Sequence, residues 1–199
     1  MKIALSIIGI LVVAALVFQG WTIYISNVEE QQYTVTNTFD QIEIRHYPPA
    51  LMASVEKERQ AGVPSSNRNF GVLAGYIFGG NSEKQEFAMT APVHMEEDET
   101  TATMSFVLPA SAVEADLPTP NDPAVQLHWS EDEYVAAIQF SGFSSKESVA
   151  KHKAILVNTL EDQGIQYEDN FRILGYDPPF KMVDRRNEII VRVDVSTLP

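Results

Sequence analysis

The side chains in this sequence that are most able to bind a metal are its four histidines. Imidazole is a common ligand of protein-bound metals, haem iron among them. His46 lies on the apolar face of a predicted strand and His152 on the apolar face of a predicted helix, so either could present a ring nitrogen to a hydrophobic cavity. Each histidine also has a plainer interpretation, in which the ring hydrogen-bonds a backbone carbonyl inside the fold. Both interpretations of His46 stay open on spacing alone.

Methionine sulfur is a second kind of axial haem ligand that this chain could supply. Met89 follows Phe87 where a helical pattern leads back into a strand, although filling a gap in the core is the ordinary use of such a residue. Cysteine is absent, which excludes thiolate sites, cysteine nucleophiles and covalent haem attachment through C-x-x-C-H. Any haem would therefore be bound non-covalently.

Familiar catalytic patterns are also missing from the sequence, including G-x-S-x-G, H-E-x-x-H, the P-loop and G-x-G-x-x-G. The carboxylates gather in runs at 96–99 and 131–133 that are typical of solvated turns. We therefore predict a binding protein and no enzyme. A hydrolase with an unfamiliar site is the least favoured alternative. The net charge of −13 argues against nucleic acid as a partner, because phosphate binding needs basic patches.

Strand and helix patterns place these side chains. Residues 41–47 alternate, which puts His46 on the face of Ile42 and Ile44 and puts Arg45 on the opposite face. A second strand is predicted at 51–55. Apolar residues then recur at helical spacing over 70–77, and Gly79 and Gly80 are expected to end that helix.

The rest of the chain repeats this plan. Strands are predicted at 88–95 and 101–108, and a proline-rich connection follows at 116–123. Two more strands (125–129 and 134–140) precede a helix that opens at a capping box of Ser144 and Glu147 and ends near Gly164. Closing strands are expected at 171–176 and 188–195. The order of elements predicts an α+β fold built from two similar halves.

The amino-terminal segment has no charged residue from position 3 to position 25. Since a membrane helix needs about 20 apolar residues, residues 1–26 are predicted to be a transmembrane anchor and residues 27–199 the domain that it tethers. A signal-like segment is the alternative. Lys2 precedes the segment and Glu29 and Glu30 follow it, which favours a single-pass protein with its domain outside the cytoplasm, periplasmic in a Gram-negative bacterium. An organelle membrane is the other possible host.

Five motifs carry a resemblance to a known family: I-E-I-R-H-Y-P-P-A (42–50), F-G-V-L-A-G-Y-I-F-G-G-N (70–81), M-T-A-P-V (89–93), F-S-G-F-S (140–144) and R-R-N-E-I (185–189). Their order and spacing resemble the SOUL haem-binding protein family from about residue 33 to residue 195. The resemblance implies a twisted, barrel-like antiparallel β structure with two helices, in two pseudo-symmetric halves. It also implies non-covalent binding of haem or a related tetrapyrrole. In one branch of the family a histidine is proposed as axial ligand, and the matching position here is His46.

The resemblance gives each candidate cofactor-binding residue a role. His46 is the possible ligand of haem iron, and two cationic side chains, Lys84 and Arg185, could offset the haem propionates. Arg186 is an alternative to Arg185. The candidate apolar wall, which would equally make an ordinary core, consists of Phe70, Leu73, Ile77, Phe87 and Met89. The competing functions are binding of another amphipathic small molecule and recruitment of a protein partner.

Overall fold

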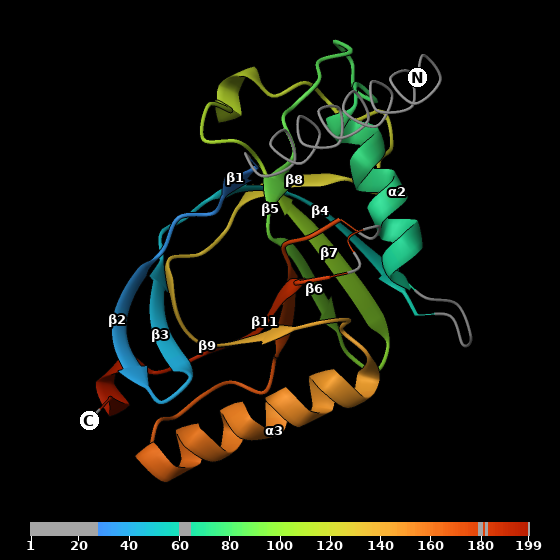
Figure 1. Ribbon diagram of the computed structural model, residues 1–199. Coiled ribbons are helices and arrows are strands. Elements are labelled where there is room, and N and C mark those ends of the chain that lie inside the picture. The colour runs from blue at the N-terminus through green and yellow to red at the C-terminus, as the bar shows by residue number, and fades with distance from the viewer. Residues whose placement is uncertain (1–27, 60–64, 179–180, 182, 199) are drawn as a thin grey trace, which may run out of the picture.

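The computed structural model describes residues 28–59, 65–178, 181 and 183–198. The predicted anchor at 1–26 lies outside this range. Over the described part of the chain, no helix is long and apolar enough to cross a membrane. Most of the strands form one sheet that curls into a barrel-like shape, with a helix on each of two sides (Figure 1).

The strands are β1 (Glu29–Glu30), β2 (Thr34–Phe39), β3 (Ile42–Tyr47), β4 (Leu51–Glu58), β5 (Thr90–Ala91), β6 (Val93–Glu97), β7 (Thr101–Val107), β8 (Gln126–Trp129), β9 (Glu133–Ser141), β10 (Arg172–Gly175) and β11 (Arg186–Arg192). The helices are α2 (Ser65–Ile77) and α3 (Lys146–Gln163), and single 3-10 turns lie at Glu114–Asp116 and Val195–Thr197.

The order of strands in the large sheet shows the duplication. The order is β2-β3-β9-β11-β10-β6-β7-β4-β8, and every neighbouring pair is antiparallel. Read outward from the central pair β10 and β6, β11 matches β7, β9 matches β4, and β3 matches β8. The helices obey the same symmetry, because α2 packs on β4 and β7 while α3 packs on β9 and β11. The predicted α+β fold in two pseudo-symmetric halves is therefore confirmed.

Helix α2 begins earlier than the apolar spacing predicts, because the polar stretch before Phe70 is also helical. It ends as expected at the paired glycines. The Gly80 N–H donates to the Gly75 carbonyl over 2.7 Å, and a Cβ built on Gly80 would lie 2.5 Å from that same oxygen. Only glycine fits there. Leu73, Tyr76 and Ile77 are buried against β4 and β7.

Helix α3 ends at Gly164 as predicted, but the predicted cap at Ser144 is wrong. Its N-cap is Ser145, one residue later than expected, and the Ser145 side chain accepts a hydrogen bond from the Ser148 N–H. Gly164 ends the helix with a left-handed φ of 69°, a conformation that glycine adopts without strain. Leu156 and Leu160 are fully buried on the β9 and β11 side of the sheet.

Candidate functional site

The predicted apolar wall divides into a buried part and an exposed part. Leu73 and Ile77 are essentially closed to solvent, and Phe87 is 9% exposed with its ring stacked on Tyr76 at 5.6 Å. These side chains form the core between α2 and the sheet. They are therefore core residues, and their side chains are closed or nearly closed to solvent.

The exposed part of this wall begins at Phe70, which is 37% exposed and packs edge-on against Phe106 at 5.3 Å. Met89 is half-buried at the edge of the same core. Phe78, which was not among the predicted site residues, follows the last residue of α2 and is 60% exposed. Phe70 lies within α2, and Phe78 lies one residue beyond its end. We call Phe70, Phe78 and Met89 the α2 surface.

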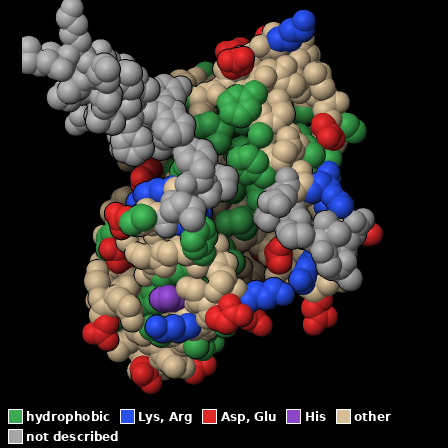
Figure 2. All heavy atoms as spheres, turned by 45° about the vertical axis from the view of Figure 1, so that its right-hand side comes forward, with side chains coloured by type: hydrophobic (Ala, Val, Ile, Leu, Met, Phe, Trp, Pro, Cys, Tyr) green, Lys and Arg blue, Asp and Glu red, His purple; other side chains and the backbone are tan. Residues whose placement is uncertain are grey.

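In Figure 2 the molecule is turned so that the side carrying α2 comes forward. Hydrophobic side chains run along this face into a hollow between the upper and lower parts of the molecule, and charged side chains border them. Exposed apolar area of this kind marks binding surfaces in soluble domains.

A rigid turn places Lys84 next to the α2 surface. Asn81 builds the turn: its Nδ2 donates to the carbonyls of Tyr76 and Gln85, and its Oδ1 accepts from the Gln85 N–H over 2.9 Å. Lys84 itself adopts a left-handed φ of 56° and its side chain is exposed. The G-G-N motif thus ends α2 and fixes the backbone of the turn that carries Lys84.

Arg185 is mostly engaged within its own loop. Its Nη1 donates to the carbonyls of Pro178 and Lys181 at 2.9 and 3.0 Å, and the guanidinium lies over the Phe143 ring at 5.2 Å. Its Nε is buried and has no hydrogen-bond partner among the described atoms. Arg185 therefore closes the connection between β10 and β11, and a propionate would compete with these backbone contacts.

His46 lies apart from the α2 surface, because β3 belongs to the other half of the sheet; Figure 1 places α2 and β3 on opposite sides of the molecule. The alternation holds, since His46 shares a face with Ile42 and Ile44, but the imidazole sits at the rim and is 30% exposed. Its Nε2 lies 2.8 Å from Asp132 Oδ1, and its ring stacks on Tyr134 at 4.7 Å.

The remaining histidines have structural partners. His152 stacks on Phe140 at 4.6 Å and donates from Nδ1 to the Ser148 carbonyl. His128 Nε2 lies 2.8 Å from the Ser54 hydroxyl. His94 is buried, its Nε2 lies 2.8 Å from Gln31 Oε1, and burial together with the charge of Arg172 lowers the pKa of His94 to about 3. At neutral pH it is therefore an uncharged hydrogen-bond donor.

A buried charge network occupies the sheet face opposite α3, and nothing in the sequence pattern pointed to it. Arg45 contacts Glu188 over 2.6 Å, and Tyr176 and Arg186 also donate to Glu188 at 2.9 Å each. Burial alone would raise the pKa of the Glu188 carboxyl, but the hydrogen bonds and charges of the two arginines hold it below its usual value. Burial raises the pKa of the neighbouring Tyr47 to about 12.

The first and last motifs of the family resemblance contact each other in this network, and residues of other motifs form further framework contacts. Arg45 belongs to the first motif and Glu188 to the last. Asn187, also in the last motif, donates from Nδ2 to the Gly142 carbonyl of the F-S-G-F-S motif over 2.7 Å. Thr90 in M-T-A-P-V donates to the Val107 carbonyl. These contacts assign part of each of these motifs to the framework, while the same set of motifs also contains the candidate ligand-contact residues His46, Phe70, Phe78 and Met89.

Comparisons with known proteins name the family of this duplicated α+β domain. The family described as SOUL heme-binding protein matches residues 28–192. This chain belongs to that family.

Heme-binding protein 2 from Mus musculus is 32% identical over 155 residues, which cover 74% of this chain and 75% of the relative. Heme-binding protein 2 from Homo sapiens is 30% identical with the same coverage, and heme-binding protein 1 from Xenopus laevis is 28% identical over 74% of this chain and 80% of its own length.

Solved structures with this fold share little sequence with the chain. The EcmrR C-terminal domain superposes with a TM-score of 0.59 at 12% identity, covering 77% of this chain and 97% of that domain. An uncharacterized conserved protein from Listeria innocua gives 0.60 at 12% identity, and a hydrolase from the same organism gives 0.57 at 11%; each alignment covers 77% of this chain and 92% of the other. At such identities the likeness shows the fold alone.

Proposed function

We propose that this protein binds haem or a related tetrapyrrole non-covalently at the α2 surface. The observation that carries the proposal is membership of the SOUL family over residues 28–192, together with relatives that are named heme-binding proteins. The geometry adds a surface of suitable chemistry. Phe70 and Phe78 expose aromatic rings, and a flat macrocycle gains most of its affinity from apolar contact of this kind.

The charge of the protein sets a requirement for such a ligand. A net charge of −13 repels the anionic propionates, so a cation beside the surface must offset the field. Lys84 meets this requirement, since the Asn81 turn presents it next to the end of α2. Arg185 is the second candidate, although its present contacts are with backbone carbonyls.

His46 is proposed as the ligand of haem iron in a second binding geometry. Histidines that bind metals usually donate their other ring N–H to a carboxylate or carbonyl, which fixes the ring and increases its basicity. Asp132 stands in this relation to His46 Nε2 and would leave Nδ1 to bind iron. Because β3 lies far from α2 in Figure 1, one haem is not expected to contact His46 and Phe78 together. The two geometries therefore make opposite predictions for mutants.

We propose further that residues 1–26 tether the domain to a membrane and hold it outside the cytoplasm. The support is the uncharged run at 3–25 together with the contacts that residues 30 and 31, shortly after this run, make with the rest of the domain. The Gln31 N–H donates to the Ala91 carbonyl over 2.8 Å, and Glu30 pairs with Arg186 at 3.0 Å. Retention of the protein in carbonate-washed membranes, with digestion by protease added from the non-cytoplasmic side, would support the tether. Release by carbonate would contradict it.

A haemin titration of the full chain, followed by its Soret absorbance, tests the proposed function. Covering a phenylalanine ring contributes about 1.5–3 kcal/mol, so we expect Phe78→Ser to weaken haemin affinity about tenfold. Val35→Ser is the matched control, because Val35 is 43% exposed on β2, away from α2. A saturable change that Phe78→Ser weakens and Val35→Ser does not would support the α2 surface. Equal affinities would remove it, and the absence of saturable binding would remove the haem proposal.

A further inference from the structure

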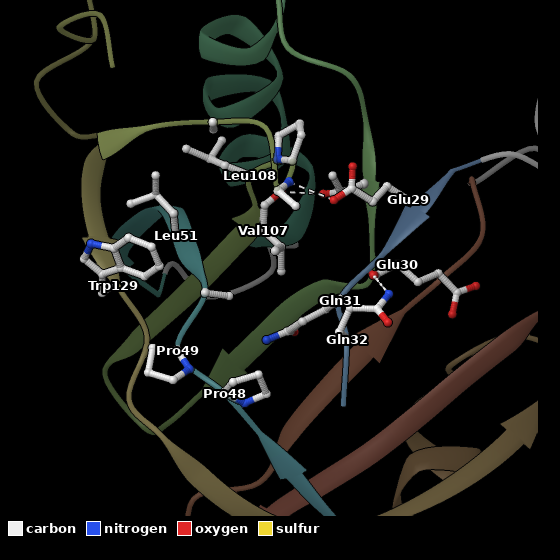
Figure 3. A pocket seen from close by; sticks show the side chains of 15 residues that line it. Glu29, Glu30, Gln31, Gln32, Pro48, Pro49, Leu51, Val107, Leu108 and Trp129 are labelled. Carbon is white, nitrogen blue, oxygen red and sulfur yellow. Dashed lines mark hydrogen bonds between the residues drawn. The ribbon is translucent and has the colours of Figure 1, made fainter. Parts of the chain in front are cut away.

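A cleft of about 260 Å³ lies at one end of the sheet, and one of its lining residues is Thr90, which follows Met89 of the α2 surface. Its walls come from β1, from the connection between β3 and β4, from the segment that follows β7, and from the end of β8 (Figure 3). These segments are far apart in sequence but are bonded to one another. The Ala50 N–H donates to the Ser130 hydroxyl over 2.9 Å, and Glu29 Oε1 accepts from the Ala110 N–H over 2.7 Å. The cleft is therefore a formed feature of the fold.

One side of the cleft is apolar and rigid. Leu51 and Leu108 form part of the buried core and are 5% and 3% exposed. Pro48 and Pro49 add two rings without conformational freedom. Trp129 is 50% exposed, yet its Nε1 donates to Glu114 Oε2 over 2.7 Å, which fixes the orientation of the indole. An exposed and oriented indole favours a ligand with an apolar or cationic group.

The other side of the cleft is acidic. Figure 3 shows Glu29 and Glu30 across the cleft from Trp129. Among the described residues that line the cleft, none is a lysine or an arginine. Glu30 forms an ion pair with Arg186 at 3.0 Å. Glu29 instead accepts a hydrogen bond from the Ala110 backbone N–H, which carries no net charge and does not neutralise the carboxylate. Glu114 adds a carboxylate behind the indole. The local field therefore attracts cations and repels anions.

We propose that this cleft binds a small organic cation that carries an apolar group, such as an alkyl or aryl ammonium ion. The apolar group would pack between Trp129 and the two prolines, and the ammonium would lie toward Glu29. Haem is a poor occupant of the same cleft because its propionates are anionic and because a volume of about 260 Å³ suits a ligand smaller than a porphyrin. Neither Phe70 nor Phe78 is among the described residues that line the cleft, so the site is distinct from the aromatic part of the α2 surface, and it does not depend on the haem proposal.

Three probes that share a benzyl group and differ in charge test the contribution of charge: benzyltrimethylammonium, benzyl alcohol and phenylacetate. We expect calorimetry on the full chain to show saturable binding of the cation. The neutral alcohol should bind at least tenfold more weakly, and phenylacetate should not bind. Added salt should weaken binding of the cation, since the carboxylates lie near the surface. Equal affinities for cation and alcohol, or no binding of the cation at millimolar concentration, would overturn the proposal.

A pair of charge-matched variants locates the site. Glu29→Gln removes the negative charge and keeps a side-chain oxygen that can accept from the Ala110 N–H. Glu99→Gln removes the same charge from the exposed turn between β6 and β7. We expect at least a fivefold loss of benzyltrimethylammonium affinity in Glu29→Gln and none in Glu99→Gln. Equal losses would show a general field effect and contradict the site. Displacement of bound haemin by the cation would contradict the separation of the two surfaces.

Discussion

Arg45 on β3 and Glu188 on β11 form an ion pair that is closed to solvent. Nη1 of Arg45 lies 2.6 Å from Oε2 of Glu188, and the two side chains are 3% and 0% exposed. Strand β9 separates their strands in the sheet, and 143 positions separate them in the sequence. The pair connects the first family motif to the last and fixes the face of the sheet opposite α3.

Removing one member of this pair should destabilise the fold. In Arg45→Met, Glu188 keeps Arg186 and Tyr176 but loses its shortest contact, and breaking a buried pair typically costs about 3–5 kcal/mol. We expect a loss of about 3 kcal/mol in the free energy of unfolding, measured by urea denaturation.

The double variant Arg45→Met/Glu188→Met is the control for this prediction. It also removes the buried carboxylate that has lost its shortest contact, so we expect it to be at least 1 kcal/mol more stable than Arg45→Met alone. A single variant that loses less than 1 kcal/mol would show that the pair contributes little to stability.

His94 should make the stability of the fold depend on pH. Its pKa is about 3 in the folded state, against 6.5 for the free side chain. Below pH 6.5 the unfolded chain therefore binds a proton that the folded chain does not. The free energy of unfolding then decreases as the pH is lowered, by up to about 1.4 kcal/mol per pH unit, until the folded state also protonates near pH 3. The His94→Gln variant should lose this part of the slope between pH 6 and pH 4. Identical slopes in urea titrations of both proteins would contradict the buried neutral state of His94.

Two glycine substitutions should have opposite effects. A Cβ at position 80 would lie 2.5 Å from the Gly75 carbonyl oxygen, and backbone cannot move aside cheaply. At Gly71, which is exposed within α2, no atom lies within 4 Å of the added Cβ. We expect Gly80→Ala to cost at least about 2 kcal/mol and Gly71→Ala to stabilise the helix by up to about 1 kcal/mol. Equal melting temperatures for the two variants would show that the turn before Lys84 is not constrained as described.

Spectroscopy tests the ligand role of His46. If iron binds there, His46→Ala should change the spin state of bound ferric haem, measured by electron paramagnetic resonance, and should weaken affinity about tenfold. Asp132→Asn should weaken binding less, because the ring keeps a hydrogen-bond partner for Nε2. His128→Ala is the matched control on β8. An unchanged spectrum in His46→Ala would remove the ligand role and leave the α2 surface unaffected.

The elements of the fold could be predicted because their signals are local. Alternation identifies β3, helical spacing identifies most of α2, and the serine cap and Gly164 bound α3. The short strand β1 could not be predicted, since a two-residue strand has no period. Its position is set by pairing with β5 and by the Glu30–Arg186 contact, and both of these partners are far from β1 in sequence.

The site was harder to predict than the fold, for a physical reason. Alternation assigns residues to faces of a strand but does not say what covers each face. Both faces of β3 are covered, so Arg45 is buried although its position in the pattern resembles a solvent-facing one. The same limit applies to α2. Helical spacing identifies Leu73 and Ile77, which are core residues, but it does not include the more exposed Phe78.

The most direct test of the account is the location of bound haem. Ferric haemin is paramagnetic, so at one equivalent it should broaden the backbone amide signals of residues near it in the nuclear magnetic resonance spectrum of the isotope-labelled protein. Binding at the α2 surface predicts broadening over α2 and the turn at 78–89, with the signals of β2 and β3 unchanged. Broadening centred on β3, or none at one equivalent, would contradict it.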